Sequence, residues 1–231
     1  MKKIYLLAFT SLLTSAAFSQ VKWGAQVIGN LSSAQVLELD SDDEDLIKKK
    51  SIFNYGFGLS AEVPLAKELT LRPSLNLLKK GVEFNANFSD PSMGYREEYS
   101  FTTHLYYAEL PVNLAINGSL KSGKYFFGFG PSFGLGLTGK VKTQSTYQDP
   151  GQQVETESEE LDAFASEDDN GGGFKRLEVS GNIIGGIQFN NGFYANAGYL
   201  VGFTNSIQGE DGSYKNKGFQ LTLGMFFSKK K

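Results

Sequence analysis

The stretch Phe219–Phe227, FQLTLGMFF, decides the fold of this 231-residue chain. Apolar side chains occupy every second position of the stretch, and Gln220, Thr222 and Gly224 lie between them. In a β-strand, alternate side chains point to opposite faces. One face of this strand therefore suits hydrocarbon and the other suits water or a narrow space, with Phe226 as the one exception.

Similar alternation recurs upstream and predicts an all-β protein. The predicted strands, about eight, lie at residues 21–29, 51–63, 68–82, 103–117, 123–142, 174–190, 192–204 and 215–228. The 13 % aromatic content and the 27 glycines also suit β-structure better than helices. After the first residues, no segment offers the roughly 20 unbroken apolar residues that a transmembrane helix needs.

The connections between these strands alternate in length. Short links lie at about 64–67, 118–122 and 190–191, and long polar links lie at about 30–50, 83–102, 143–173 and 205–214. Bacterial outer-membrane barrels place short turns in the periplasm and long loops outside the cell. This order therefore predicts a closed antiparallel transmembrane β-barrel with short periplasmic turns and long extracellular loops.

The sense of the alternation separates two kinds of barrel. A soluble barrel would point its bulky apolar face inward, whereas a membrane barrel points it toward lipid. Here the opposite face consists mainly of Gly, Ser, Asn and Gln, which are too small to fill a soluble core. The sequence favours the outer membrane of a Gram-negative cell, and a soluble periplasmic barrel that binds a small ligand is the alternative.

The beginning of the chain has the layout of a signal peptide, with Lys2 and Lys3 before an apolar stretch and small residues before Gln20. We expect residues 1–19 to be cleaved during export and residues 20–231 to form the barrel domain. Cleavage removes two lysines and no acidic residue, which changes the formal charge from −3 to −5. A nucleic-acid partner is therefore not expected. The absence of cysteine excludes disulfides and a lipid-anchored cysteine.

Aromatic residues gather where the predicted strands meet the periplasmic rim. Amphipathic rings favour the boundary between hydrocarbon and water. The candidate membrane-interface aromatics are Trp23, Tyr125, Phe127, Phe193, Phe226 and Phe227.

The predicted inner face carries charged and amide side chains that would fill the lumen. The candidates for this polar network are Glu62, Arg72, Asn76, Glu109, Asn113, Lys124, Glu178 and Asn182, with Asn196 and Gln220 beside them. A buried charge needs a partner, so we expect Arg72 and Glu109, on neighbouring strands, to share an ion pair or network. We interpret the set as a structural plug, and a narrow or gated polar path is the alternative.

No set of residues predicts a catalytic, cofactor or metal site. His104 is the only histidine, and a lone histidine near a barrel rim is typical of a solvated side chain. Gly134–Gly139, GLGLTG, matches a dinucleotide fingerprint by spelling, but no helical period follows it. The loops at about 30–50 and 143–173 are acidic, and we expect them to be solvated and mobile, with weak calcium binding as the alternative.

One predicted strand carries a more specific pattern, Tyr107–Leu114, YAELPVNL. Together with Leu71–Leu75, LRPSL, the pair Lys80-Gly81 and the opening Lys22–Ser32, it resembles the PorT-like family of small bacterial outer-membrane barrels. The resemblance implies a binding role, because some PorT-like proteins take part in assembling a protein secretion system across the outer membrane.

These observations predict a non-enzymatic integral outer-membrane barrel that acts through its extracellular loops or through protein partners. A PorT-like secretion-system assembly factor is the narrower version that the resemblance implies. The expected surroundings are outer-membrane lipid and lipopolysaccharide, with protein partners in a secretion or envelope complex. A narrow or gated small-solute channel is the alternative.

Overall fold

The computed structural model describes residues 21–37, 47–89, 92, 94–166, 171–208 and 213–227. The predicted signal peptide at residues 1–19 lies outside these residues, as does Asp40–Asp45 of the first acidic loop. Within the described ranges, no helix is long and apolar enough to cross a membrane.

Strands account for most of the described chain, and every pairing between them is antiparallel. They are β1 (Lys22–Leu37), β2 (Ile47–Pro64), β3 (Leu69–Lys80), β4 (Val82–Asn87), β5 (Arg96–Leu120), β6 (Gly123–Gln148), β7 (Glu155–Asp162), β8 (Leu177–Phe189), β9 (Phe193–Gly202) and β10 (Ser213–Phe227).

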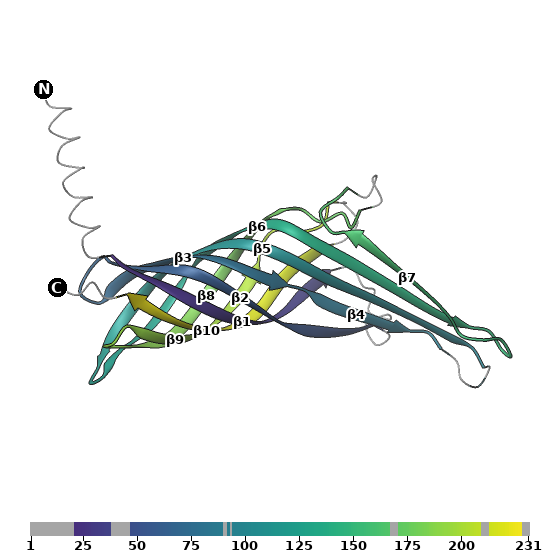
Figure 1. The fold of residues 1–231 in the computed structure, drawn as a ribbon, viewed down its shortest axis with the longest axis horizontal. Helices are drawn as coiled ribbons and strands as arrows, with labels where there is room; N and C mark the ends of the chain where they lie inside the picture. The colour runs from purple at the N-terminus through teal and green to yellow at the C-terminus, as the bar shows by residue number, and fades with distance from the viewer. Residues whose placement is uncertain are drawn as a thin grey trace, which may run out of the picture.

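Eight of these strands close a ring (Figure 1). Their order around the wall is β1, β2, β3, β5, β6, β8, β9 and β10. The ring closes where β1 pairs with β10, from Trp23 opposite Phe227 to Leu37 opposite Ser213. Closure leaves no unpaired edge in the wall. The predicted closed antiparallel barrel of about eight strands is confirmed.

The two ends of the barrel differ in their connections. Short turns join β2 to β3, β5 to β6 and β8 to β9 at one end, which we call the turn end. Gly192 in the β8–β9 turn has a φ of +91°, and its N–H donates to the carbonyl of Phe189 at 3.0 Å. Glycine adopts such a positive φ without steric cost, as expected for an Asn-Gly hairpin. The opposite end, which we call the loop end, carries the long connections, so the predicted alternation is confirmed.

At the loop end, strands continue where the sequence predicted loops. β4 continues β3 after Gly81, β5 begins at Arg96 and β6 extends to Gln148. β7 is an additional strand, and its one strand pairing among the described residues is with β6. The predicted loop over 143–173 is therefore wrong for residues 143–148, which belong to β6, and for residues 155–162, which form β7. Backbone hydrogen bonds to the β5–β6 hairpin order this segment although its side chains lack the alternation of a half-buried strand.

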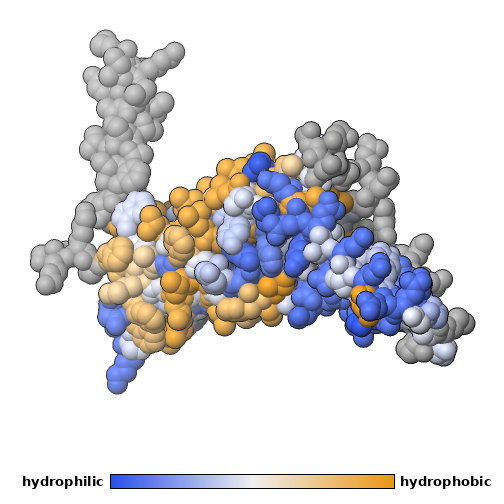
Figure 2. Space-filling model, turned by 45° about the vertical axis from the view of Figure 1, so that its right-hand side comes forward, coloured by the Kyte–Doolittle hydropathy of each residue, from blue (hydrophilic) through white to orange (hydrophobic). Residues whose placement is uncertain are grey.

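The outer face of the ring is apolar. Every second side chain of β10 from Phe219 to Phe227 is exposed, and those between are buried or half-buried. On other strands Phe53, Phe57 and Ile183 each expose more than 60 % of their surface. Figure 2 shows the resulting orange belt on the barrel and a hydrophilic surface toward the loop end. This is the sense of alternation predicted for a barrel in lipid and the opposite of a soluble barrel.

The six aromatic candidates fall into two groups. The exposed group, near the turn end, consists of Trp23, Tyr125, Phe127, Phe193 and Phe227. Their place at a membrane interface stays a prediction. Phe226 is only 3 % exposed, so the prediction for this residue is wrong. Its position in β10 puts the side chain on the inner face, where its ring stacks on Tyr194 with centroids 4.7 Å apart.

Candidate functional site

At the turn end, one buried carboxylate inside the barrel is surrounded by basic side chains. Glu62 on β2 accepts hydrogen bonds from Arg72 at 2.5 Å and from Lys124 at 2.8 Å. Lys22 donates to the same carboxylate at 2.9 Å. We call these four residues the turn-end cluster. Three positive charges against one negative charge leave it with a formal charge of +2.

Aromatic rings complete the layer around Arg72. The guanidinium lies 3.7 Å from the ring centre of Phe126 and donates to Gln188 Oε1 at 2.5 Å. It also lies 5.8 Å from the ring of Phe226, which stacks on Tyr194. A cation over an aromatic face is attracted by the ring quadrupole, more strongly where water is excluded. Charge and ring contacts together hold Arg72 across the interior of the barrel.

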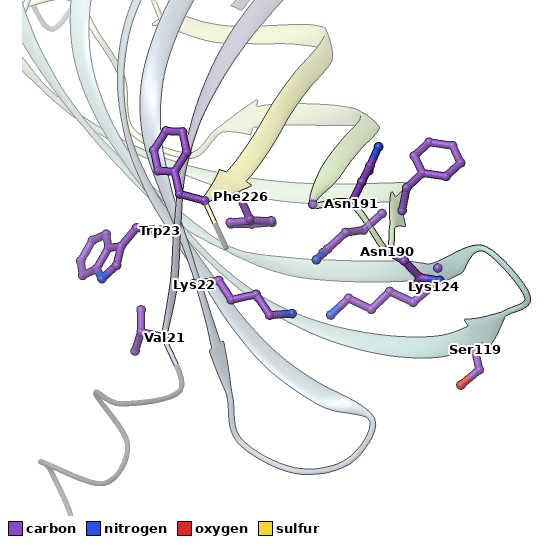
Figure 3. A pocket seen from close by; sticks show the side chains of 13 residues that line it. Val21, Lys22, Trp23, Ser119, Lys124, Asn190, Asn191 and Phe226 are labelled. Carbon is purple, nitrogen blue, oxygen red and sulfur yellow. The ribbon is translucent and has the colours of Figure 1, made fainter. Parts of the chain in front are cut away.

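The turn-end cluster separates a wide outer cavity from a small inner one. The outer cavity is an open bowl of about 670 Å³ at the turn end, lined in part by Trp23 and the β8–β9 turn. Figure 3 shows Lys22 and Lys124 pointing toward each other inside this bowl. The inner cavity measures about 50 Å³ and is lined mainly by amide and hydroxyl side chains, which is room for very few water molecules. The bowl therefore ends at the cluster.

Further along the barrel, one buried lysine is surrounded by carboxylates. Lys80 Nζ donates to Glu178 at 2.7 Å and also to Glu109. Glu178 accepts further hydrogen bonds from Ser180 at 2.8 Å and from Asn216 at 2.6 Å. We call Lys80, Glu109 and Glu178 the loop-end cluster. Its formal charge is −1, and none of its three charged side chains is more than 3 % exposed.

The predicted ion pair between Arg72 and Glu109 is wrong. The register of β3 and β5 places Arg72 opposite Asn113 and Glu109 opposite Asn76, so each charge finds its partner elsewhere. The partner of Glu109 is Lys80, which the alternation analysis did not count among the inner residues. The signal for it was present, because Lys80 follows Arg72 by an even number of positions in the same predicted strand, and even spacings return to the same face.

The other predicted lumen residues lie between or beside the two clusters. Asn76 Oδ1 accepts a hydrogen bond from Gln26 at 2.7 Å, and Asn182 donates to Asn113 at 3.0 Å. Of the eight candidates, Lys124 is half-buried and the other seven are buried inside the wall. A role for these residues beyond filling the lumen stays a prediction.

Apolar side chains close the lumen at the loop end. Phe164 and Phe174 belong to the segment between β7 and β8 and are buried against residues of the wall. The rings of Phe164 and Tyr107 meet edge to face at 6.0 Å, and those of Phe174 and Tyr214 do so at 5.0 Å. This segment therefore folds back into the mouth of the barrel. We call the apolar cluster around these four rings the plug.

Beyond the plug, five strand segments continue outside the ring as one sheet. They are Ile47–Ser51 of β2, then β4, Arg96–Thr102 of β5, Lys140–Tyr147 of β6 and β7, in that order. We call this the loop-end sheet. Its outline is the long extension of Figure 1, and its surface is largely hydrophilic in Figure 2.

The other residues that the sequence singled out form no further site among the described residues. Hydrogen bonds from Tyr95 and Tyr99 lower the pKa of Glu97. His104 is a half-buried residue of β5. Gly134–Gly139 lies wholly within β6, without the turn and helix of a dinucleotide site. In the described part of the chain, no group of three or more His, Cys, Asp or Glu could hold a metal ion.

A closed ring of antiparallel strands with an apolar belt outside and polar side chains inside defines a transmembrane β-barrel. A family model described as outer membrane protein beta-barrel domain matches residues 18–208, so the chain belongs to this family. The turn end therefore faces the periplasm and the loop end faces the outside of the cell.

Several solved structures of outer-membrane proteins match most of this chain at low sequence identity and low TM-score. Ail, the attachment invasion locus protein of Yersinia pestis, is 14 % identical with a TM-score of 0.33, and the match covers 89 % of this chain and 99 % of that chain. OprG from Pseudomonas aeruginosa is 13 % identical with a TM-score of 0.35, covering 90 % and 95 %. Neisserial surface protein A is 10 % identical with a TM-score of 0.34, covering 89 % and 97 %. No curated protein matches the sequence.

Proposed function

We propose that the protein is a closed, non-enzymatic outer-membrane barrel whose loop-end sheet binds protein partners outside the cell. The observation that carries this proposal is the length of the strands. β5 has 25 residues and β6 has 26, whereas a strand needs only about 9–11 residues to cross the membrane. The excess forms an ordered hydrophilic sheet beyond the apolar belt, and a sheet of this kind is a rigid surface for binding.

The closed lumen favours binding over transport. A solute would have to pass the turn-end cluster, the loop-end cluster and the plug in succession. The first two are held by ion pairs between different strands, and the third by packed aromatic rings. In planar bilayers we therefore expect the purified barrel to give no conductance steps. Steady conductance by the folded protein would favour the narrow or gated channel instead.

A narrower version follows from the resemblance to PorT-like barrels, in which the partner belongs to a secretion or envelope complex. Its support is the sequence likeness around Tyr107–Leu114 and the neighbouring segments. This stretch lies in the wall part of β5 and supplies Glu109 to the loop-end cluster. The likeness therefore concerns the barrel itself, and the partner has to be found by experiment.

A shortened β6–β7 hairpin tests the binding proposal. In this variant Asn-Gly replaces residues 145–157 and joins Gln144 to Ser158, which face each other in the ladder. We expect the barrel to remain folded, seen as an unchanged shift between unheated and boiled samples on a detergent gel. Proteins cross-linked to the native loop end in intact cells should be lost from the variant.

A matched control changes the opposite end of the barrel. Lys121→Ala, in the β5–β6 turn, should leave the set of cross-linked proteins unchanged. Equal recovery of the same partners with the native and the shortened barrel would overturn the proposal.

A further inference from the structure

The bowl at the turn end contains more positive charge than its own carboxylate neutralises. Lys22 Nζ donates to Glu62 Oε1 at 2.9 Å, and Lys124 Nζ donates to Glu62 Oε2 at 2.8 Å. Arg72 donates to the same Oε2. An ammonium group has three donors, so each lysine can serve Glu62 and still donate to an acceptor in the bowl. The bowl therefore combines several N–H donors with a formal excess of two positive charges.

The whole turn end has the same sign of charge. Among the described residues of its turns and strand ends, five are basic and two are acidic, which gives a net charge of +3. They are Lys22, Lys67, Arg72, Lys121 and Lys124 against Glu62 and Glu68. The chain as a whole has a formal charge of −3. A cleft lined by one sign of charge concentrates ions of the other sign, so this end of the barrel attracts anions from the periplasm.

The lining of the bowl changes from polar to apolar across the rim. Inside the barrel it consists of the two lysines and Gln188, and the turns add hydroxyl and amide groups from Ser119, Asn190 and Asn191. Toward the outer face, the exposed rings of Trp23, Phe189 and Phe227 line the same cavity. Its volume of about 670 Å³ lies within the range of small-molecule sites. A molecule with both an anionic group and an apolar part would contact both kinds of lining.

A phosphate group matches the charged part of the bowl. A phosphate monoester has a charge of about −1.5 to −2 at pH 7 and three strong acceptor oxygens. This charge balances the +2 of the turn-end cluster, whereas a single carboxylate would neutralise only half of it. Lysine is a common phosphate ligand. The ammonium groups of Lys22 and Lys124 point toward each other in Figure 3, so an anion between them would also reduce their repulsion.

We propose that the bowl binds an organic phosphate, with the phosphate group between Lys22 and Lys124 and the apolar part against the rings of the rim. The site faces the periplasm, at the end opposite the loop-end sheet. The inference therefore goes beyond the binding of partners outside the cell and does not depend on it. Two sources supply such a phosphate, namely the headgroup of a lipid in the periplasmic leaflet and a soluble phosphorylated molecule.

Titration with butyl phosphate tests the site in the folded barrel. The protein is purified in a maltoside detergent, which contains no phosphate. Trp23 lines the bowl and is the only tryptophan, so its fluorescence reports binding there, and calorimetry measures the affinity. We expect a saturable change with butyl phosphate that weakens as salt is added. Butanol, which has the same apolar part without the phosphate, should give no such change.

Lys22→Gln combined with Lys124→Gln tests the two assigned ligands. Each lysine supplies a charge-assisted hydrogen bond, so each single change should weaken binding about tenfold and the pair about a hundredfold. The matched control is Lys67→Gln with Lys121→Gln, which removes the same charge from the same end. Neither of these lysines lines the bowl, so the affinity should change by less than about twofold. The heat-dependent gel shift of each variant shows that the barrel has folded.

A chain that ends at Phe227 tests whether the described residues suffice. The last four residues, SKKK, follow a residue that lines the bowl and lie outside the described part of the chain. We expect this shortened chain to bind butyl phosphate with the affinity of the full-length protein. Binding that is lost here but kept without Lys22 and Lys124 would belong to the tail and would overturn the inference.

Native mass spectrometry of protein extracted from outer membranes distinguishes the two sources. A phospholipid that is retained by the native barrel and missing from the variant without both lysines would identify a lipid headgroup. The same retained lipids in both, together with butyl phosphate binding by the native barrel alone, would identify a soluble phosphate. No saturable change with the native barrel, or equal binding by the variant without both lysines, would overturn the inference. Neither result would alter the proteins cross-linked to the loop-end sheet, so the proposed function would stand.

Discussion

The turn-end cluster and the loop-end cluster have opposite arrangements of charge. The first places three basic side chains around Glu62, and the second places two carboxylates around Lys80. They differ most in access to water, since Lys22 is 52 % exposed, whereas the loop-end charges are at most 3 % exposed. The excess charge of the turn-end cluster is hydrated in the bowl, but that of the loop-end cluster is held by protein groups alone. Removing a charged partner should therefore lower the free energy of unfolding most in the loop-end cluster.

The largest expected effect is that of Lys80→Met. It leaves Glu109 and Glu178 buried without a counter-ion, and breaking a buried pair in this way costs about 3–5 kcal/mol. The free energy of unfolding should fall by about this amount. Denaturant unfolding of the detergent-solubilised barrel measures it, with the fluorescence of Trp23, the only tryptophan, as the signal.

A triple variant provides the control for this prediction. Adding Glu109→Gln and Glu178→Gln to Lys80→Met removes the unpaired charges while keeping the side-chain shapes nearly unchanged. Most of the lost stability should return. A triple variant as unstable as Lys80→Met would mean that packing, and not charge, makes Lys80 important.

The next effect in size is that of Glu62→Gln, which removes the carboxylate at the centre of the turn-end cluster. The lysines can then turn toward water in the bowl, and Arg72 keeps Gln188 and the ring of Phe126. The expected loss is about 2–3 kcal/mol, smaller than for Lys80→Met. Glu83→Gln, on the exposed loop-end sheet, is the matched control and should change stability little. A loss equal to that of Lys80→Met would remove the distinction between the clusters.

The smallest effect should come from Lys124→Gln. Its side chain is 23 % exposed, and Arg72 and Lys22 still neutralise Glu62. We expect a loss of about 1 kcal/mol or less that shrinks as salt is added. Lys22→Gln, on a more exposed lysine, should cost no more than this. The same unfolding assay at low and high salt measures both, and a salt-independent loss for Lys124→Gln would contradict the role of solvent access.

Much of the wall could be predicted because strand direction is a local property. In β10 the alternation from Phe219 to Phe227 alone assigned the outer face, and the structure exposes those side chains. The same rule could have corrected two errors, since Phe226 lies at an inner position of β10 and Lys80 at an inner position of β3. Phe226 was predicted to face the membrane interface because it is aromatic, although its position in the alternation is an inner one. Lys80 was not counted among the inner residues, although it lies an even number of positions after Arg72.

The loop end could be predicted far less well. β7 has no apolar alternation, because nearly all its side chains are exposed and its strand conformation comes from pairing with β6. The plug was also missed, because Phe164 and Phe174 meet partners from distant strands. Neither feature leaves a periodic pattern in the segment that forms it.

By itself, the sequence determined that the chain forms a closed barrel with apolar side chains outside and short and long connections at opposite ends. Strand period and connection length are both local and can be counted along the chain. Only the tertiary structure decided which charges meet and that the lumen is closed. Such contacts depend on the stagger between strands around the ring, which brings Lys80 to Glu178 across 98 positions of sequence.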